Sequence, residues 1–236
     1  ALRRALDRGE FRLLYQPILA LQPNRIVGVE ALLRWQHPRF GFVGPDRFIP
    51  ILEETGLIST VGRWVIDAAL QDLARWRAAG HADIKVAVNV STLQLLRHEL
   101  KEEIAESLNR HSIDGTALEL EVTESLLMSN PDATALTLSD LKSLGVGIAI
   151  DDFGTGYSSL SYLKRLPIDK LKIDQSFVRD LGEGGEDHTI VNMVIAMAHA
   201  LGIRATAEGV ETLEQLRLLE QQGCDEVQGY LIAKPQ

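Results

Sequence analysis

The stretch Val146-Gly147-Ile148-Ala149-Ile150-Asp151-Asp152 decides the architecture of this chain, because a short apolar run ends at two adjacent carboxylates. Six other apolar runs also meet an acidic or amide side chain at their end: Glu30, Asn89, Glu121, Asp174, Glu208 and Gln228. Short runs rich in Val and Ile, separated by helix-like stretches, are typical of parallel strands. The carboxyl ends of such strands form one face of a barrel. We therefore expect these polar groups to converge in space.

The order of strand and helix patterns predicts an α/β fold with a mostly parallel sheet. The expected strands span Phe11–Ile18, Arg25–Leu33, 84–90, 118–123, 146–150, 170–173, 203–207 and 226–229. The expected helices span 46–54, Ser59–Ala79, Leu93–Arg110, Asp132–Leu144, Ser158–Leu163, Asp187–Leu201 and Thr212–Gln221. Eight strands favour a barrel over an open sheet, and the short turn Gln22-Pro23-Asn24 allows the first two strands to form a hairpin.

We therefore predict a modified TIM (β/α)8 barrel in which one strand is antiparallel. A chain of 236 residues suits one such barrel, which typically has about 250 residues. Residues 1–236 are expected to form a single domain, and residues 1–10 to be the end of a linker helix from a longer protein. Residues 182–187, rich in Gly and Glu, are expected to form a solvated loop.

Composition narrows the classes of function. The net charge of -9 and the pI of about 5.2 argue against a surface that binds nucleic acid polymers. Cys224 is the only cysteine, so no intramolecular disulfide can form, which fits a reducing cytoplasm. No stretch approaches the roughly 18 apolar residues of a membrane span. We expect a cytoplasmic domain without membrane contact of its own, which leaves room for a membrane-anchored parent protein.

The converging carboxylates predict a divalent metal site, because clustered acids are costly to bury without a compensating cation. Glu30, Glu121 or Glu208 taken singly would be interpreted as a surface acid at a strand end, and only the recurrence of the pattern favours a site. Asp151 and Asp152 are adjacent and point in different directions, so one of them can bridge two ions. A solvated turn is the weaker alternative for this pair, given the apolar run before it.

An all-oxygen ligand set favours Mg²⁺ or Mn²⁺ over zinc, and the amide of Asn89 is a neutral candidate ligand. Lys172 alternates with Leu171 and Ile173, so we expect it to point inward and to keep its proton among the acids. It can hold a water molecule or stabilise charge on a phosphate, and a structural ion pair is the alternative.

Residues 153–159 read Phe-Gly-Thr-Gly-Tyr-Ser-Ser, which predicts a mobile loop over the site with glycine hinges. A plain connection capped by Ser158 is the alternative. The kinase-like triplet at 152–154 lacks a His-Arg-Asp loop elsewhere in the chain. The resemblance to a dinucleotide fingerprint fails because Ser159 replaces the third glycine and the Asp pair would repel a pyrophosphate.

Taken together, these residues resemble the EAL domains, the bacterial cyclic di-GMP phosphodiesterases. Glu30-Ala31-Leu32, followed by Leu33-Arg34-Trp35, matches the signature that names the family. The likeness covers nearly the whole chain, with ordered motifs at 15–17, 48–50, 53–56, 89–91, 121–124, 151–160, 172–174, 207–211 and 228–230. So many ordered motifs make a chance resemblance very improbable.

The resemblance implies a role for each matching residue. The implied metal ligands, for two Mg²⁺ or Mn²⁺ ions, are Glu30, Asn89, Glu121, Asp151, Asp152 and Glu208. Lys172 would orient the attacking water, a role favoured over that of a base because its acidic neighbours raise its pKa. Gln228 would contact that water or the waters of the metal ions, Glu124 would support the glycine-containing loop, and Glu211 would support the surroundings of Lys172. Gln16 and Arg34 would bind substrate, Arg34 through phosphate.

The implied reaction is hydrolysis of one phosphodiester of cyclic di-GMP to linear pGpG. A catalytically silent cyclic di-GMP receptor is the second hypothesis, and a metal-dependent barrel acting on another phosphorylated or carboxylated metabolite is the third. The resemblance also implies a homodimer formed through helices near the glycine-containing loop, and sensor or diguanylate cyclase domains in a parent protein. The resemblance also leads us to expect a further helix after the last strand, before which the sequence stops at Lys234-Pro235-Gln236.

Overall fold

Eight strands close into a mixed barrel, which confirms the predicted fold class. The computed structural model describes residues 2–97, 99–124, 131–155, 160–182 and 185–236. Around the barrel the strands are β1 (Phe11–Ala20), β2 (Arg25–His37), β4 (Lys85–Asn89), β5 (Leu118–Thr123), β6 (Gly147–Phe153), β7 (Lys170–Ile173), β8 (Arg204–Ala207) and β9 (Glu226–Val227). Strand β9 then meets β1 and closes the circle, with Leu19 opposite Val227.

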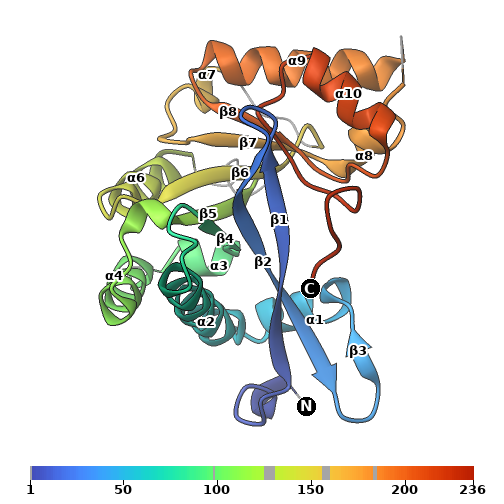
Figure 1. The fold of residues 1–236 in the computed structure, drawn as a ribbon. Helices are drawn as coiled ribbons and strands as arrows, with labels where there is room; N and C mark the ends of the chain where they lie inside the picture. The colour runs from blue at the N-terminus through green and yellow to red at the C-terminus, as the bar shows by residue number, and fades with distance from the viewer. Residues whose placement is uncertain (1, 98, 125–130, 156–159, 183–184) are drawn as a thin grey trace.

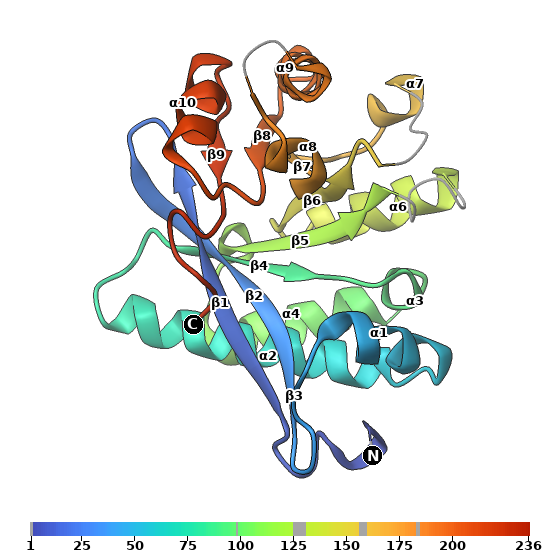
Figure 2. The same ribbon diagram turned by 90° about the vertical axis from the view of Figure 1, so that its right-hand side faces the viewer.

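Strand β1 is antiparallel to both of its neighbours, as the short turn after it predicts. All other neighbouring pairs around the barrel, from β2–β4 through β8–β9, are parallel. The β1–β2 hairpin is longer than the other strands and projects beyond the barrel, where β2 also pairs with β3 (Gly41–Val43) (Figures 1 and 2). The sequence pattern did not predict β3, which has only three residues.

Helices cover the outside of the barrel (Figures 1 and 2). They are α1 (Pro45–Glu54), α2 (Ile58–Ala78), α3 (Thr92–Leu95), α4 (Leu100–His111), α6 (Pro131–Lys142), α7 (Leu160–Leu163), α8 (Gln175–Arg179), α9 (Glu186–Ala200) and α10 (Leu213–Gln221). Single 3₁₀ turns lie at Leu2–Arg4 and Gly115–Ala117. None of the helices in the described parts of the chain is long and apolar enough to cross a membrane.

Two helix predictions need correction. The single helix expected at 93–110 is two helices: α3 begins at a capping box formed by Ser91 and Gln94 and ends at Leu95, and α4 begins at Leu100. Helix α8 was not predicted, since five residues are too few to show helical periodicity. It is instead started by Asp174, whose carboxylate accepts a hydrogen bond from the Ser176 N–H at 2.9 Å.

After β9, residues 228–236 form turns and irregular structure. This segment returns to the open side of β1. Backbone hydrogen bonds link Tyr15 and Gln236 in both directions, at 2.9 and 3.1 Å. The end of the segment therefore satisfies backbone groups of β1 beyond its short pairing with β9.

The barrel interior contains charged side chains because every second residue of a strand points inward. On β7, Leu171 and Ile173 are fully buried among the apolar core residues, while Lys170 and Lys172 make ion pairs across the barrel. Lys170 lies 2.7 Å from both Glu119 of β5 and Glu226 of β9, with all three side chains less than 8% exposed. A second layer of charged side chains surrounds Lys172, which lies two residues further along β7 and so nearer to the carboxyl ends of the strands.

Replacing Lys170 by Ala is expected to destabilise the fold by about 3–5 kcal/mol, because two carboxylates would be left buried without their cation. Lys142→Ala is the matched control: its ion pair with Asp169 is about one-third exposed on both sides, so a loss of at most about 1 kcal/mol is expected. Urea unfolding of both variants measures the difference. Equal stabilities of the two variants would contradict a buried ion-pair layer.

Candidate metal centre

The polar residues at the strand ends converge around the ammonium group of Lys172, which is 1% exposed. Its Nζ lies 2.7 Å from Glu208 Oε1, 2.9 Å from Glu121 Oε2 and 3.0 Å from Asp151 Oδ1. A fourth carboxylate oxygen, Oε2 of Glu30, lies 3.9 Å away. These acids come from β2, β5 and β6 and from the residue after β8, so the closed barrel is what brings them together.

The buried charges shift one another's pKa values. Burial alone would lower the pKa of Lys172, but Asp151, Glu121 and the other carboxylates outweigh it and raise that pKa well above its ordinary value. Burial, then repulsion from Glu30, raises the pKa of Glu121 well above its usual range. Burial also raises the pKa of Glu208 to about 8; Lys172 opposes this shift, and Asp151 adds to it. The single positive charge of Lys172 therefore does not offset the cost of burying all of these carboxylates in their ionised form.

Amide side chains fix the orientation of Glu30. Asn89 Nδ2 donates to Glu30 Oε1 at 2.8 Å, and Gln228 Nε2 donates to Glu30 Oε2 at 2.6 Å. Burial raises the pKa of Glu30, but Lys172 and these two hydrogen bonds outweigh it, so its pKa is lowered. Because Asn89 uses its N–H₂ group on Glu30, its amide oxygen remains the atom that can face a cation.

The adjacent acids diverge as expected, with Asp151 buried and Asp152 exposed. Asp152 has a φ of 53°, which is unusual for a residue other than glycine and is often found at functional sites. Although the residue as a whole is exposed, partial desolvation of its carboxyl group, with the charges of Asp151 and Asp174, raises the pKa of Asp152 to about 6. One carboxylate oxygen from each of Asp151, Asp152 and Glu208 lies within 4.8 Å of the others, which is close enough to share a metal ion.

The donor set fits a hard divalent cation. Both carboxylate oxygens of Glu121 and Oδ1 of Asp151 are buried without a hydrogen-bond partner in the described parts of the protein. The Lys172 contacts are short in distance but are not aligned as hydrogen bonds, so these oxygens keep lone pairs for another ligand. Buried carboxylates normally find such partners, and oxygen-only sites suit Mg²⁺ or Mn²⁺.

The beginning of the glycine-containing loop is anchored to the site. Glu124 Oε2 accepts a hydrogen bond from the Gly154 N–H at 3.0 Å. Gly154 has a φ of 101°, and a Cβ there would lie 2.9 Å from the Phe177 ring, so the close approach of α8 requires glycine. Residues 156–159, on which the predicted hinge Gly156 and the cap Ser158 fall, lie outside the described residues.

The two predicted substrate-binding residues and Glu211 line the mouth of the site. Gln16 is buried: its Oε1 accepts from Gln228 at 3.0 Å and its Nε2 donates to the Ala233 carbonyl at 3.1 Å. Arg34 donates to the Leu33 carbonyl at 3.0 Å, and Glu211 is exposed. The ion pairs of Lys172 within the described parts of the chain go to four other acids, so the supporting role of Glu211 stays a prediction.

Two hollows meet over the acidic cluster. The first lobe, of about 300 Å³, is polar and is lined by residues that include Gln16, Glu208, Glu211 and Gln228. The second lobe, of about 510 Å³, has a mainly apolar wall formed by α1 and α2, with Ile49, Ile58 and Val61. Both lobes are bordered by the same five residues: Glu30, Leu32, Arg34, Asp151 and Gln175. Sequence patterns gave no reason to select Leu32 or Gln175, since neither is an acid or base at a strand end.

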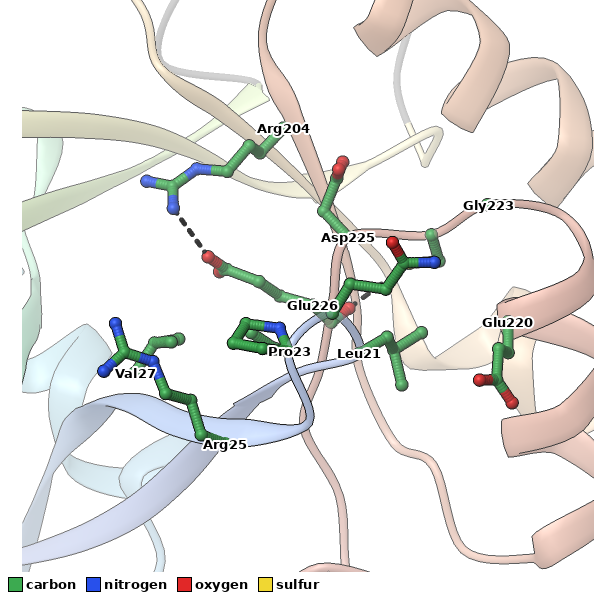
Figure 3. A pocket seen from close by; sticks show the side chains of 12 residues that line it. Leu21, Pro23, Arg25, Val27, Arg204, Glu220, Gly223, Asp225 and Glu226 are labelled. Atoms are coloured by element: carbon green, nitrogen blue, oxygen red, sulfur yellow. Dashed lines mark hydrogen bonds and ion pairs between the residues drawn. The ribbon is translucent and has the colours of Figure 1, made fainter.

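A separate cavity of about 380 Å³ lies at the other end of the barrel, beside the β1–β2 turn (Figure 3). There Arg204 points toward Glu226, and the two side chains form an ion pair at 2.9 Å. Its acids are therefore partly neutralised by arginine, unlike those around Asp151. TIM-like barrels use the face at the carboxyl ends of the strands, so we place the candidate site there.

The fold and the site define a TIM-like barrel with an acidic centre at the carboxyl ends of its strands. The chain belongs to the EAL domain family, whose model matches residues 1–235.

Two curated relatives from Pseudomonas aeruginosa are close in sequence. The chain is 46% identical over 234 residues to the bifunctional diguanylate cyclase/cyclic di-GMP phosphodiesterase MucR, covering 99% of this chain and 34% of that protein. It is 47% identical to the cyclic di-GMP phosphodiesterase NbdA, covering 99% of this chain and 30% of that protein. The chain thus spans about a third of the length of these relatives.

Solved structures agree in fold. The structure described as the PaMucR phosphodiesterase in complex with c-di-GMP has a TM-score of 0.96 and 46% identity, with 99% of this chain and 95% of that chain covered. The EAL domain of Mycobacterium smegmatis DcpA has a TM-score of 0.80 and 38% identity, covering 96% of this chain and 92% of that chain.

Mn²⁺ is expected to stabilise the protein, by about 2.7 kcal/mol at a concentration a hundred times its Kd. Asp151→Asn should remove most of this stabilisation, because it removes a charge from the group of oxygens that can share an ion. Asp83→Asn, at a highly exposed carboxylate before β4, is the control and should retain it. Thermal unfolding with Mn²⁺ and with EDTA measures both, and an unchanged Mn²⁺ effect in Asp151→Asn would argue against this metal centre.

Proposed function

We propose that this domain hydrolyses cyclic di-GMP to linear pGpG with two Mg²⁺ or Mn²⁺ ions. The observation that carries the proposal is the charge of the cluster. Five carboxylates and one ammonium leave four negative charges when all are ionised, which two divalent cations would balance. The curated relatives named as cyclic di-GMP phosphodiesterases support the choice of substrate.

The proposed ligands are Glu30, Asn89, Glu121, Asp151, Asp152 and Glu208. When bound, the ions supply activation of a water molecule and neutralisation of phosphate charge. Lys172 keeps its proton and so orients the water rather than accepting its proton. Gln228 is suited to the same task, since its Oε1 is buried without a hydrogen-bond partner among the described residues.

Substrate binding is assigned to Gln16 and Arg34, with Arg34 placed at the border of both lobes to contact phosphate. Glu124 supports the loop after β6 through the Gly154 N–H. Glu211 is assigned a supporting role at the wall of the first lobe.

We also propose the kind of protein in which this domain acts. We infer that residues 1–236 act as one domain of a longer cytoplasmic or membrane-anchored protein with sensor or diguanylate cyclase domains. The bifunctional name of the MucR relative supports the latter kind of partner. The net charge of -9 argues against nucleic acid polymers as partners.

Turnover of cyclic di-GMP by the purified chain tests the function. We expect pGpG to form with Mg²⁺ or Mn²⁺ and to be absent in EDTA, with products resolved by chromatography. Binding of cyclic di-GMP without any product would instead make the domain a receptor, and absence of binding would refute both hypotheses.

Glu30→Ala is expected to lower kcat at least about a hundredfold, because it removes a proposed ligand that Asn89 and Gln228 hold in place. Glu106→Ala removes an equally sized acid from a surface ion pair with Arg63 and should leave turnover unchanged. Turnover of Glu30→Ala within threefold of the unsubstituted enzyme would break the assignment of the site.

We also propose a homodimer formed through helices near the glycine-containing loop. Leu136 on α6 is 71% exposed, which is unusual enough for a large apolar side chain to suggest a contact surface. Sedimentation at high concentration should show a dimer that Leu136→Asp weakens, with Leu213→Asp, at a 60% exposed position of α10, as the control. A monomer at every concentration would count against the dimer.

A further inference from the structure

Helix α8 is a short but well-anchored element beside the acidic cluster. The Asp174 carboxylate caps its beginning through the Ser176 N–H, and the buried Gln215 amide donates to the carbonyls of Val178 and Arg179 at 2.9 and 3.1 Å. The Phe177 ring lies against Gly154 of the loop after β6. Side chains presented by a helix held in this way have a defined position.

Gln175 is the first residue of α8 and lies against the loop after β8. Gly209, which follows the proposed ligand Glu208, has a φ of 71°, and a Cβ on it would lie 2.6 Å from the Gln175 Cβ. The absence of a side chain at residue 209 therefore makes room for Gln175. The Gln175 side chain is exposed, and its amide makes no hydrogen bond to the described parts of the protein, so both its donor and its acceptor are available.

Gln175 differs from the other four residues that border both lobes. Of the residues that border both lobes, Glu30 and Asp151 belong to the acidic cluster, Leu32 is apolar and Arg34 is assigned to phosphate. Gln175 is the remaining polar group, and it comes from the opposite part of the fold, on α8 rather than β2. A ligand that reached from one lobe into the other would pass between β2 and α8.

A cyclic dinucleotide has the shape to do this, because two bases project from one ring of sugars and phosphates. We propose that Gln175 is a substrate-positioning residue that hydrogen-bonds the sugar–phosphate ring of the bound cyclic dinucleotide at the border of the two lobes, opposite Arg34. This inference rests on the proposed function. A neutral amide is suited to the place, since a carboxylate there would repel phosphate and the amide can donate without competing for the metal ions.

A charge series at residue 175 tests the inference. Affinity for cyclic di-GMP, measured by calorimetry with Ca²⁺ under conditions where chromatography detects no product, should fall about three- to tenfold in Gln175→Ala. It should fall further in Gln175→Glu, by at least about tenfold relative to Ala, and recover in Gln175→Arg. With Mg²⁺, KM should rise more than kcat falls. An acidic residue in the first turn of a helix does not destabilise it, so the loss in Gln175→Glu cannot be assigned to unfolding.

Gln221→Glu provides the matched control, because it makes the same charge change at an exposed position on α10. It should bind cyclic di-GMP as tightly as the unsubstituted protein. If all three Gln175 variants bind within twofold of that protein, the inference is wrong while the proposed function stands. If Gln175→Glu binds more tightly than Gln175→Ala, the contact is to a base edge and the ring assignment is wrong. If the unsubstituted protein binds no cyclic di-GMP, the proposed function itself fails.

Discussion

The burial of one ammonium group among four carboxylates is the interaction around which the barrel is organised. A closed sheet must place every second side chain inside, and in this chain Lys172 and the ends of β2, β5 and β6 fill that space with charge. Burying these acids is tolerable only because Lys172 lies between them. The same lysine leaves several carboxylate oxygens without a hydrogen-bond partner, which makes the centre receptive to cations.

Three side-chain amides form a chain of hydrogen bonds that orients one of the buried carboxylates. Asn89 and Gln228 hold Glu30 from two sides, and Gln16 connects Gln228 to the backbone at Ala233. Asn89 and Gln228 thereby fix the direction in which the Glu30 carboxylate points, and Gln16 holds Gln228 in place. The orientation of Glu30, a proposed ligand, is therefore set before any ion or substrate arrives, which is what a preorganised site requires.

Much of this could be predicted from sequence because alternation and strand-end position are local patterns. The run before Asp151 and Asp152 predicted both the strand and the location of the acids, and Lys172 was expected inside from its alternation with Leu171. Features that depend on tertiary contacts escaped prediction. Helix α8 is defined by its cap and by Gln215 rather than by periodicity, and Gln175 matters only because α8 lies over Gly209.

The closure of the barrel by β1 and β9 has a consequence for folding. Gln16 and Gln228 are 212 residues apart in the chain, and Glu30 and Gln228 are 198 apart, yet they are hydrogen-bonded partners within the centre. Contacts between such distant parts of a chain form late, since the loop between them must close first. The centre is thus assembled only when the ends of the chain meet, so a nascent or clipped fragment has strands but no competent acidic cluster.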